Sequence, residues 1–203
     1  MMPSNLRMRI TSGKARGITL RSPRGDSTRP ATDAARQAVF SSLAGAVEGA
    51  EVLDLFAGTG AYGLEAVSRG ASGVVFVESD ARAVECLKAN ISAVLKAVGG
   101  GSARTVRADC FSLKAAQLGG VPDIVFADPP YPLLLKNPGA VFALFGEVCG
   151  PCTLVVLEAP GEFEPPEGSG FSLVKRLGKR SKGKPSQLLF RKSAADAGLE
   201  GGK

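Results

Sequence analysis

The chain has 203 residues, contains neither histidine nor tryptophan, and carries a formal net charge of +6 at pH 7. This length suits one domain with a substantial core, and a content of 44% hydrophobic and 22% charged residues is typical of folded proteins. The lack of histidine excludes Ser-His-Asp triads, histidine bases and histidine metal ligands. No apolar run approaches the ~18 residues of a membrane span, and the N-terminus lacks an apolar signal core, so we expect a cytoplasmic protein without membrane contact.

The positive charge is concentrated near the two ends of the chain. Residues 1–36 contain eight Lys or Arg and two acidic residues, and residues 171–192 contain eight Lys or Arg and no acidic residue. Residues 37–170, by contrast, contain eight basic and fifteen acidic residues. Basic segments attract polyanions through counterion release, and nucleic acid is the commonest such partner. The pattern favours a nucleic-acid partner, with a solvated basic surface as the alternative.

The first predicted elements form a small N-terminal extension. Two short apolar runs, residues 8–11 and 17–20, flank a Gly/Lys turn and predict a β-hairpin. A loop rich in Pro, Gly and Arg follows. A helix is then predicted to begin after a cap at Thr32 or Asp33 and to end near residue 44.

From residue 51 onward, predicted strands and helices alternate. Strands are predicted at residues 51–56, 73–77, 103–107, 123–127, 152–158, 171–177 and 187–191, and helices at residues 60–68, 80–98, 111–118 and 138–148. This order predicts an α/β fold: a Rossmann-like, mostly parallel seven-stranded sheet with helices on both faces. In such sheets, ligands bind beyond the carboxyl ends of the strands.

The four cysteines suit reduced thiols better than a disulfide scaffold. Cys149-Gly150-Pro151-Cys152 has the spacing of a thioredoxin-type redox motif, but that motif opens a helix, whereas a β-branched, strand-like run follows here. A zinc site would need further ligands, and neither a second such pair nor a histidine is present. We therefore predict a structural turn and no metal.

A glycine-rich loop follows the first strand of the alternating pattern. Gly58, Gly60 and Gly63 satisfy G-x-G-x-x-G, which allows a tight turn and the close approach of a ligand to the next helix. Glu78 ends the next strand and can bind ribose hydroxyls, so the arrangement predicts a nucleoside cofactor, with a ligand-free tight turn as the alternative. Asp54 precedes the loop, where its carboxylate would repel a pyrophosphate but can orient the ammonium of an amino-acid group. This favours S-adenosylmethionine over a dinucleotide.

The segment Asp128-Pro129-Pro130-Tyr131 follows the apolar strand at residues 123–127. Consecutive prolines fix the backbone, so the Asp128 carboxylate and the Pro129 carbonyl can accept hydrogen bonds from both N–H groups of an exocyclic amine. Tyr131 can stack on the base that carries the amine. Such acceptors favour a pyramidal nitrogen whose lone pair points at a sulfonium methyl group, a reaction that needs neither metal nor histidine. The alternative is a plain proline-rich turn.

These motifs resemble those of class I methyltransferases that act on exocyclic amines of bases. The segments Arg9–Leu20 and Arg29–Phe40 are, more specifically, similar to the N-terminal part of the bacterial 16S ribosomal RNA guanine-N2 methyltransferase family, the RsmD type. The similarity runs from about residue 8 to residue 192. It implies methylation of a guanine N2 with S-adenosylmethionine as donor, by a monomer that acts on 16S RNA or the assembling 30S subunit.

The resemblance also implies an organisation of the chain and roles for single residues. Residues 1–44 would form a basic, RNA-facing extension, residues 45–192 the methyltransferase domain, and residues 193–203 a disordered tail. The predicted cofactor contacts are Asp54, Phe56, Ala57, Gly58, Gly60, Glu78, Ser79, Asp109 and Cys110. The predicted guanine contacts are Asp128, Pro129, Pro130 and Tyr131. The predicted RNA contacts are Arg16, Arg29, Arg36, Lys179, Arg180, Lys182 and Lys184. Arg29 and Arg36 suit a second role equally well, which is to pin the N-terminal segment over the site.

Two positions depart from the pattern of that family. Tyr62 stands where the family more often has an aliphatic residue, and the Lys-rich segment 179–184 replaces an Arg…Tyr-Gly ending, which leaves the RNA contacts at this edge and the exact target open. An adenine-N6 DNA methyltransferase is an alternative, because Asp-Pro-Pro-Tyr serves that chemistry too. Residues 132–203, however, leave little room for a separate target-recognition domain. A non-catalytic RNA-binding module for ribosome assembly is a second alternative.

Overall fold

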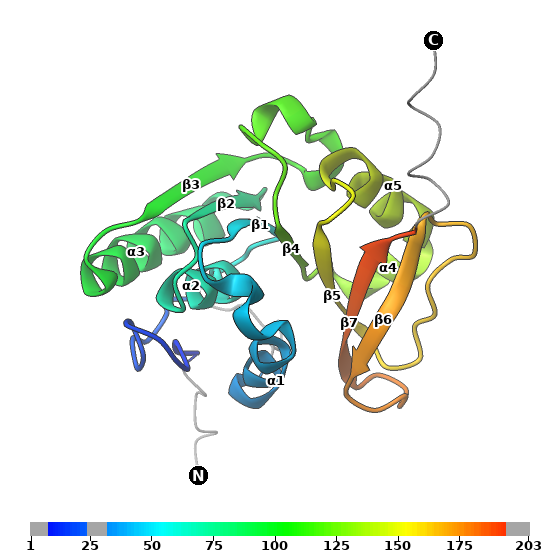
Figure 1. Ribbon diagram of the computed structural model, residues 1–203, viewed down its shortest axis with the longest axis horizontal. Helices are drawn as coiled ribbons and strands as arrows, with labels where there is room; N and C mark the ends of the chain where they lie inside the picture. Colours follow the sequence, from blue (N-terminus) through cyan, green and yellow to red (C-terminus); the bar gives the residue numbers. More distant parts are fainter. Residues whose placement is uncertain (1–7, 24–31, 194–203) are drawn as a thin grey trace.

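The computed structural model describes residues 8–23 and 32–193. Within these residues, seven strands form one sheet in the order β3-β2-β1-β4-β5-β7-β6 (Figure 1). The strands are β1 Glu51–Leu55, β2 Gly73–Glu78, β3 Ser102–Arg107, β4 Ile124–Ala127, β5 Leu154–Pro160, β6 Phe171–Leu177 and β7 Pro185–Lys192. The first five strands run parallel, and β7 is antiparallel to both β5 and β6. The prediction of an α/β fold with a mostly parallel seven-stranded sheet is confirmed.

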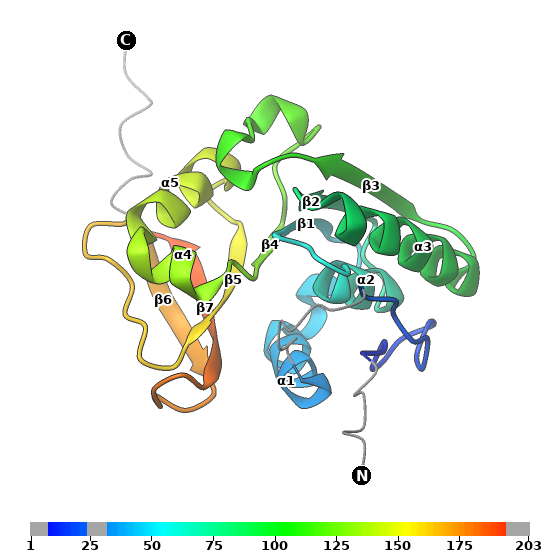
Figure 2. The same cartoon turned by 180° about the vertical axis from the view of Figure 1, so that it is seen from behind.

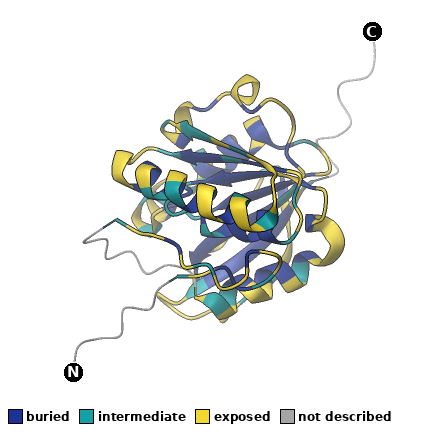
Figure 3. Cartoon of the chain, turned by 90° about the vertical axis from the view of Figure 1, so that its left-hand side faces the viewer, coloured by how far each residue is buried: buried dark blue, intermediate teal, exposed yellow. Residues whose placement is uncertain are grey.

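Helices cover both faces of this sheet (Figures 1 and 2). The α-helices in the described ranges are α1 Asp33–Leu43, α2 Ala61–Ser68, α3 Ala81–Val98, α4 Tyr131–Lys136 and α5 Pro138–Val148. One hydrophobic cluster includes Phe40 and Leu87 on the side of α1 to α3, and the other includes Leu134 and Phe145 on the side of α4 and α5. Figure 3 shows the buried strands between helices whose outer sides are exposed. None of the helices in the described part of the chain is long and apolar enough to cross a membrane.

Capping residues set the ends of two helices. Thr32 caps α1, because its hydroxyl accepts a backbone N–H of the first turn at 3.2 Å. Asp80 caps α3, because its carboxylate accepts the N–H groups of Arg82 and Ala83 at 2.7 and 3.1 Å. Gly99 ends α3 with a φ of 82°, a left-handed conformation that suits glycine.

The chain between β3 and α5 differs from the prediction in two places. Residues 111–118 do not form one helix but lie in two short 3-10 turns, Cys110–Ser112 and Ala115–Gln117. The buried side chains here, Leu113 and Leu118, are five residues apart, which does not suit one face of an α-helix. The short helix α4, in turn, has no periodic signal in the sequence. It starts directly after the proline pair, and Pro132 in its first turn favours that start.

The Cys149–Cys152 segment forms the turn between α5 and β5. The Gly150 N–H donates to Thr153 Oγ1 at 3.0 Å, and the Thr153 N–H donates back to the Gly150 carbonyl at 3.3 Å. Both thiols are free, and burial raises the pKa of Cys149 to about 12. The prediction of a structural turn agrees with this geometry. No group of three or more potential metal ligands occurs among the residues that the structure describes.

Residues 8–20 fold back on themselves and pack against α2. Their two arms are joined by backbone hydrogen bonds of 2.8 to 2.9 Å and by an isolated antiparallel bridge between Arg9 and Thr19, so the predicted hairpin is present without full strands. Three apolar side chains of this segment are buried in the same hydrophobic cluster as α2: Ile10, Ala15 and Leu20. The N-terminal segment therefore shares the core of the main sheet.

Candidate active site

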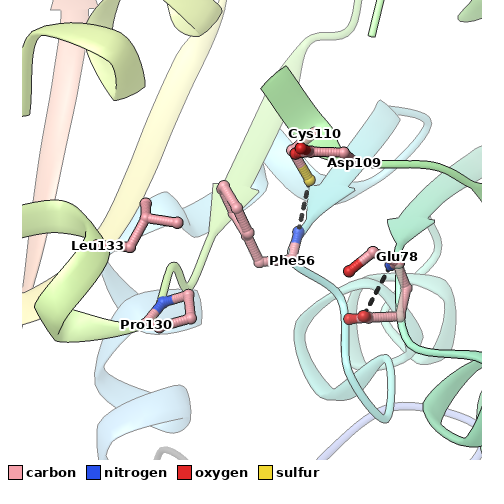
Figure 4. Close-up of a pocket in the computed structure, with 7 residues that line it drawn as sticks. Phe56, Glu78, Asp109, Cys110, Pro130 and Leu133 are labelled. Atoms are coloured by element: carbon pink, nitrogen blue, oxygen red, sulfur yellow. Dashed lines mark hydrogen bonds between the residues drawn. The ribbon is translucent and has the colours of Figure 1, made fainter. Parts of the chain in front are cut away.

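A pocket of about 280 Å³ opens at the carboxyl edge of the parallel strands (Figure 4). Its lining residues are Phe56, Glu78, Ser79, Asp109, Cys110, Pro130 and Leu133. Five of these are predicted cofactor contacts, and Pro130 belongs to the predicted amine-binding motif. Leu133 could not be found from the sequence, because it lies on α4. The segments that follow β1, β2, β3 and β4 thus meet at one place, as expected for a parallel sheet.

The loop after β1 turns sharply at the pocket. Phe56 has a positive φ of 56°, which is rare for a residue with a side chain, and its N–H donates to Cys110 Sγ at 3.4 Å (Figure 4). The next N–H, of Ala57, donates to the Val77 carbonyl at 3.0 Å, which ties the loop to the end of β2. Gly60 has a φ of 80°, and a Cβ added there would lie 2.4 Å from Leu87 Cδ1. Glycine at this position therefore serves both the turn and the close packing of α3.

Glu78 is held rigidly at the wall of the pocket. Its Oε2 accepts the Gly58 N–H, and its Oε1 accepts the N–H groups of Ser79 and Asp80, each at 2.8 Å. A carboxylate oxygen has further lone pairs beyond these contacts, so Glu78 can still accept the hydroxyl groups of a ligand.

Asp54 lies in β1 beneath the glycine loop, close in sequence to the pocket-lining Phe56. Its side chain is buried, and Oδ2 accepts the Gly63 N–H at 2.9 Å. Burial raises the pKa of Asp54 to about 8, the Gly63 hydrogen bond opposes this, and the Glu78 charge adds to it. Asp54 therefore shapes the glycine loop and is not among the residues that line the pocket, and its contact with a ligand ammonium stays a prediction. Three further predicted contacts also lie outside the pocket lining: Ala57, Gly58 and Gly60.

Asp109 and Cys110 bring the end of β3 into the pocket. Asp109 Oδ1 accepts the Phe111 N–H at 3.0 Å and so starts the 3-10 turn. Burial raises the pKa of Cys110 to about 12, so this thiol is neutral and adds apolar surface to the wall. The rings of Phe56 and Phe111 meet edge to face with centroids 5.9 Å apart. Phe56 and Cys110 thus give the pocket apolar surface, and Asp109 adds a carboxyl group to its lining.

Asp128 to Tyr131 lie beside this pocket, directly after β4. Burial raises the pKa of Asp128 well above its ordinary range, and the charges of Glu158 and Asp54 raise it further. Burial also raises the pKa of Tyr131, followed by the charges of Glu158 and Asp128. Pro129 is buried and Pro130 exposed, which anchors one side of the motif and opens the other.

Tyr62 and Glu158 adjoin this motif, although the sequence did not single out Glu158. The Tyr62 hydroxyl donates to Glu158 Oε2 at 2.9 Å, and the Gln187 Nε2 donates to the same oxygen at 3.4 Å. The Tyr62 ring stacks on Phe126 with centroids 5.1 Å apart and an interplanar angle of 16°. A single acid within a strand carries no signal in sequence, and only the pairing of β4 with β5 places Glu158 next to Asp128.

The predicted RNA contacts fall into three groups. The exposed ones are Arg16, Lys179, Arg180, Lys182 and Lys184. Arg29 lies outside the described residues. Arg36 is 1% exposed, and its guanidinium donates to the Arg9 carbonyl and to Asp33, each at 2.7 Å. A phosphate contact by Arg36 is therefore wrong for this structure, and the second expectation, that it pins the N-terminal segment, agrees with these bonds.

The exposed basic loop lies at the same edge of the sheet as the pocket. Because β5 and β6 are both antiparallel to β7, their carboxyl ends share one edge, and residues 178–184 follow the end of β6. This basic loop is fixed beside the end of β5, since the Gly161 N–H donates to the Lys184 carbonyl at 2.7 Å and the Gly183 N–H to Glu162 at 2.9 Å. Arg180 pairs with Glu164 at 3.1 Å.

Comparison with known proteins identifies the family. A family model described as "Conserved hypothetical protein 95" matches residues 8–185. "Ribosomal RNA small subunit methyltransferase D" of Escherichia coli (strain K12) is 43% identical over 124 residues, 61% of this chain and 60% of that protein. "Putative rRNA methyltransferase YlbH" of Bacillus subtilis (strain 168) is 40% identical over 84 residues, 41% of this chain and 46% of that protein. These alignments span less than two thirds of the length of either relative.

A solved structure extends the similarity over nearly the whole chain. "Putative methyltransferase yhhF from Escherichia coli" superimposes with a TM-score of 0.74 and 31% sequence identity, over 93% of this chain and 99% of that one. The family model covers the N-terminal segment, the glycine loop and the Asp128 motif. The chain therefore belongs to the family described as "Conserved hypothetical protein 95", and its resemblance to the RsmD-like methyltransferases is confirmed.

Proposed function

We propose that this protein transfers a methyl group from S-adenosylmethionine to the exocyclic N2 amine of a guanine in 16S ribosomal RNA. The observation that carries the proposal is the junction at Pro130, which lines the nucleoside-sized pocket and also belongs to Asp128-Pro129-Pro130-Tyr131. A donor bound in this pocket and an amine held by the motif would be adjacent. The protein would act as a monomer in the cytoplasm, on 16S RNA or the assembling 30S subunit.

The pocket fits the adenosine part of the proposed donor. Its volume, about 280 Å³, is close to the lower bound for sites of small ligands. Glu78 would accept ribose hydroxyls, and the Asp109 carboxylate would accept the adenine amino group. Phe56 and Leu133 supply apolar surface for a flat base. When bound, S-adenosylmethionine supplies a sulfonium methyl group to a nucleophile.

The Asp128 motif would make the guanine amine nucleophilic. The N2 lone pair of guanine is delocalised into the ring, so the amine reacts only when its N–H groups are held out of the ring plane. The Asp128 carboxylate and the Pro129 carbonyl accept these N–H groups, and Tyr131 stacks on the base. Orientation of this kind contributes on the order of 7–11 kcal/mol in favourable cases. As the nitrogen gains the methyl group it loses a proton, which Asp128 accepts before release to water.

The basic loop supports an RNA substrate. Lys179, Lys182 and Lys184 project at the edge of the sheet where Asp128 lies, and Arg16 lies exposed on the N-terminal segment. Lysines at such positions bind phosphates through charge, without reading sequence. The loop would thus hold the RNA backbone while the motif holds one base.

Methylation assays with defined nucleic acids test the proposal. Purified protein is incubated with methyl-labelled S-adenosylmethionine and either naked 16S RNA, 30S particles or duplex DNA, and the labelled nucleoside is identified by mass spectrometry. Label in N2-methylguanosine of 16S RNA is expected. Label only in DNA adenine would establish the adenine-N6 reaction instead, and RNA binding without any label would indicate an assembly module.

The variant Asp128→Ala separates catalysis from cofactor binding. Asp128 does not line the pocket, so calorimetric binding of S-adenosylmethionine should be retained while methylation is lost. Retained turnover would remove Asp128 from the reaction.

A further inference from the structure

Asp128, which directly follows β4, and Glu158, which lies within β5, form a pair of neighbouring carboxyl groups. The last register pair of these strands is Ala127 with Leu157, so Asp128 and Glu158 are the next residues on two adjacent parallel strands. Adjacent strands lie ~5 Å apart, and residues in register point to the same face of a sheet. Phe126, two residues before Asp128, shares this face and stacks on Tyr62, which also bonds Glu158. Both carboxyl groups therefore face the side covered by α1 and α2.

The two carboxyl groups have unequal hydrogen-bond partners. Glu158 is 3% exposed, and its Oε2 accepts two donors, the Tyr62 hydroxyl and the Gln187 amide. Within residues 8–23 and 32–193, no donor is hydrogen-bonded to the Asp128 carboxyl. Hydrogen bonds from donors stabilise the ionised form of a carboxyl group. Two carboxyl groups this close do not both ionise readily, so the single negative charge belongs on Glu158.

We propose that Glu158 is a positioning residue for methyl transfer, which holds the negative charge of the pair and leaves a proton on Asp128 until a guanine amine binds. The inference rests on the proposed function, because it assigns Asp128 to the amine. An incoming amine donates one of its N–H groups to Asp128, which favours the carboxylate, and the proton of Asp128 leaves to water. Binding of the base and ionisation of Asp128 are thereby coupled.

The surrounding charges agree with this division. Burial raises the pKa of Asp128, and Glu158 on β5 and Asp54 on β1 raise it further. Burial also raises the pKa of Glu158, but the hydrogen bonds from Tyr62 on α2 and Gln187 on β7 and the positive charge of Arg36 on α1 oppose this.

Tyr131 on α4 also faces the pair. Its own pKa is raised by burial and by both carboxyl groups, so it stays neutral at neutral pH. Among the charged groups that the structure describes around the pair, the positive charge of Arg36 lowers the pKa of Glu158, whereas no positive charge is a cause of the Asp128 shift. The negative charge of the pair is therefore favoured on Glu158.

The test is the pH profile of single-turnover methylation for the wild type and Glu158→Gln, at saturating S-adenosylmethionine so that its charge acts on both alike. The wild-type rate should rise with pH as Asp128 ionises. The glutamine side chain is nearly isosteric with glutamate but carries no charge, so the rise should move to lower pH by about one unit or more. At a pH on the rising limb of the profile, a shift of one unit makes Glu158→Gln about tenfold faster than the wild type. A residue with a merely structural role would lower the rate at every pH and leave the midpoint in place.

Tyr62→Phe provides a second variant that does not remove a buried carboxyl group. Loss of its hydroxyl favours protonated Glu158, so some of the ionised form passes to Asp128 and the midpoint should fall by a smaller amount. Glu85→Gln, an exposed carboxylate on α3, is the matched control and should leave the midpoint unchanged. Unchanged midpoints in both Glu158→Gln and Tyr62→Phe would overturn the inference. If Glu158→Gln fails to fold, Tyr62→Phe alone decides.

A carboxyl ¹³C NMR titration of the free protein distinguishes failure of the inference about Glu158 from failure of the proposed function. The Asp128 carboxyl should titrate above its ordinary range in the wild type and lower in Glu158→Gln, without any RNA present. An Asp128 titration that Glu158→Gln leaves unmoved would overturn the inference even where guanine is methylated. If Glu158→Gln lowers the Asp128 titration but the protein methylates no guanine, the coupling of the two carboxyl groups stands and the proposed function is rejected.

Discussion

Glu65 fastens the N-terminal segment to α2 and is fully buried. Its carboxylate accepts the Thr11 N–H and hydroxyl, both at 2.7 Å, the Ser12 N–H at 3.0 Å, and the Arg69 Nε–H at 2.9 Å. We expect Glu65→Ala to destabilise the protein strongly, because two backbone N–H groups and one guanidinium lose their acceptor at once.

The magnitude follows from these contacts. Removing one partner of a buried ion pair costs about 3–5 kcal/mol, and each backbone N–H left unsatisfied costs about 1–3 kcal/mol. Detachment of the segment would let water reach the freed donors, which limits the total, so we expect a loss of about 4 kcal/mol. For a domain of this size that lowers Tm by about 10 °C.

Urea unfolding measures the free energy, and amide hydrogen exchange locates the change. Exchange should accelerate in residues 8–20 of Glu65→Ala before it accelerates in the central strands. Glu85→Ala removes an exposed glutamate from α3 and should cost less than about 0.5 kcal/mol. A loss below about 1 kcal/mol in Glu65→Ala, or unchanged exchange in residues 8–20, would refute the reasoning.

Three further predictions concern the packing, the buried acid and the basic loop. Gly13→Ala should lower Tm by several degrees more than Gly17→Ala, because a Cβ at Gly13 would lie 1.9 Å from the Ser68 carbonyl oxygen, whereas nothing lies within 4 Å at Gly17; equal shifts would contradict this. Asp54→Asn should flatten the pH dependence of urea stability: the folded pKa of about 8 exceeds the ordinary value of 3.8, so the contribution of Asp54 is fully present below about pH 4 and is lost as pH rises to about 8. Parallel stability curves for the two proteins would exclude that burial effect. Replacing the three lysines at 179, 182 and 184 by alanine should weaken RNA binding and reduce the slope of log K against log salt by about 2; an unchanged slope would make the loop a solvated surface.

Several elements could be predicted because their signals are local. The caps at Thr32 and Asp80 lie within a few residues of the N–H groups they accept, and the glycine loop and the Asp128 motif directly follow apolar strands. The order of strands and helices then placed both motifs at the carboxyl edge of one sheet. The side chains that complete the site gave no such signal. Leu133 depends on a six-residue helix without periodicity, and Glu158 depends on strand pairing.

Burial overturned one prediction at the candidate site, the phosphate contact of Arg36. Arginine is a common phosphate contact, but α1 turns Arg36 inward. There its guanidinium donates hydrogen bonds to the Arg9 carbonyl and to Asp33. Asp54 is also buried, and its carboxylate accepts the Gly63 N–H beneath the loop. In both cases the residue type alone suggests a ligand contact, but the folded chain supplies a hydrogen-bond partner within the protein.

The sequence by itself determined the order of the elements, the glycine loop, the rigid turn at Asp128-Pro129-Pro130-Tyr131 and the concentration of charge in two segments. Each of these depends on neighbouring residues, through propensity, capping and periodicity. The tertiary structure decided which of the charged groups meet. Pairing of β4 with β5 sets Asp128 beside Glu158, thirty residues further along, and α2 brings Tyr62 to the same place. Contacts across such separations arise from register and packing, which no local pattern encodes, and they set the protonation of the residue on which the proposed chemistry depends.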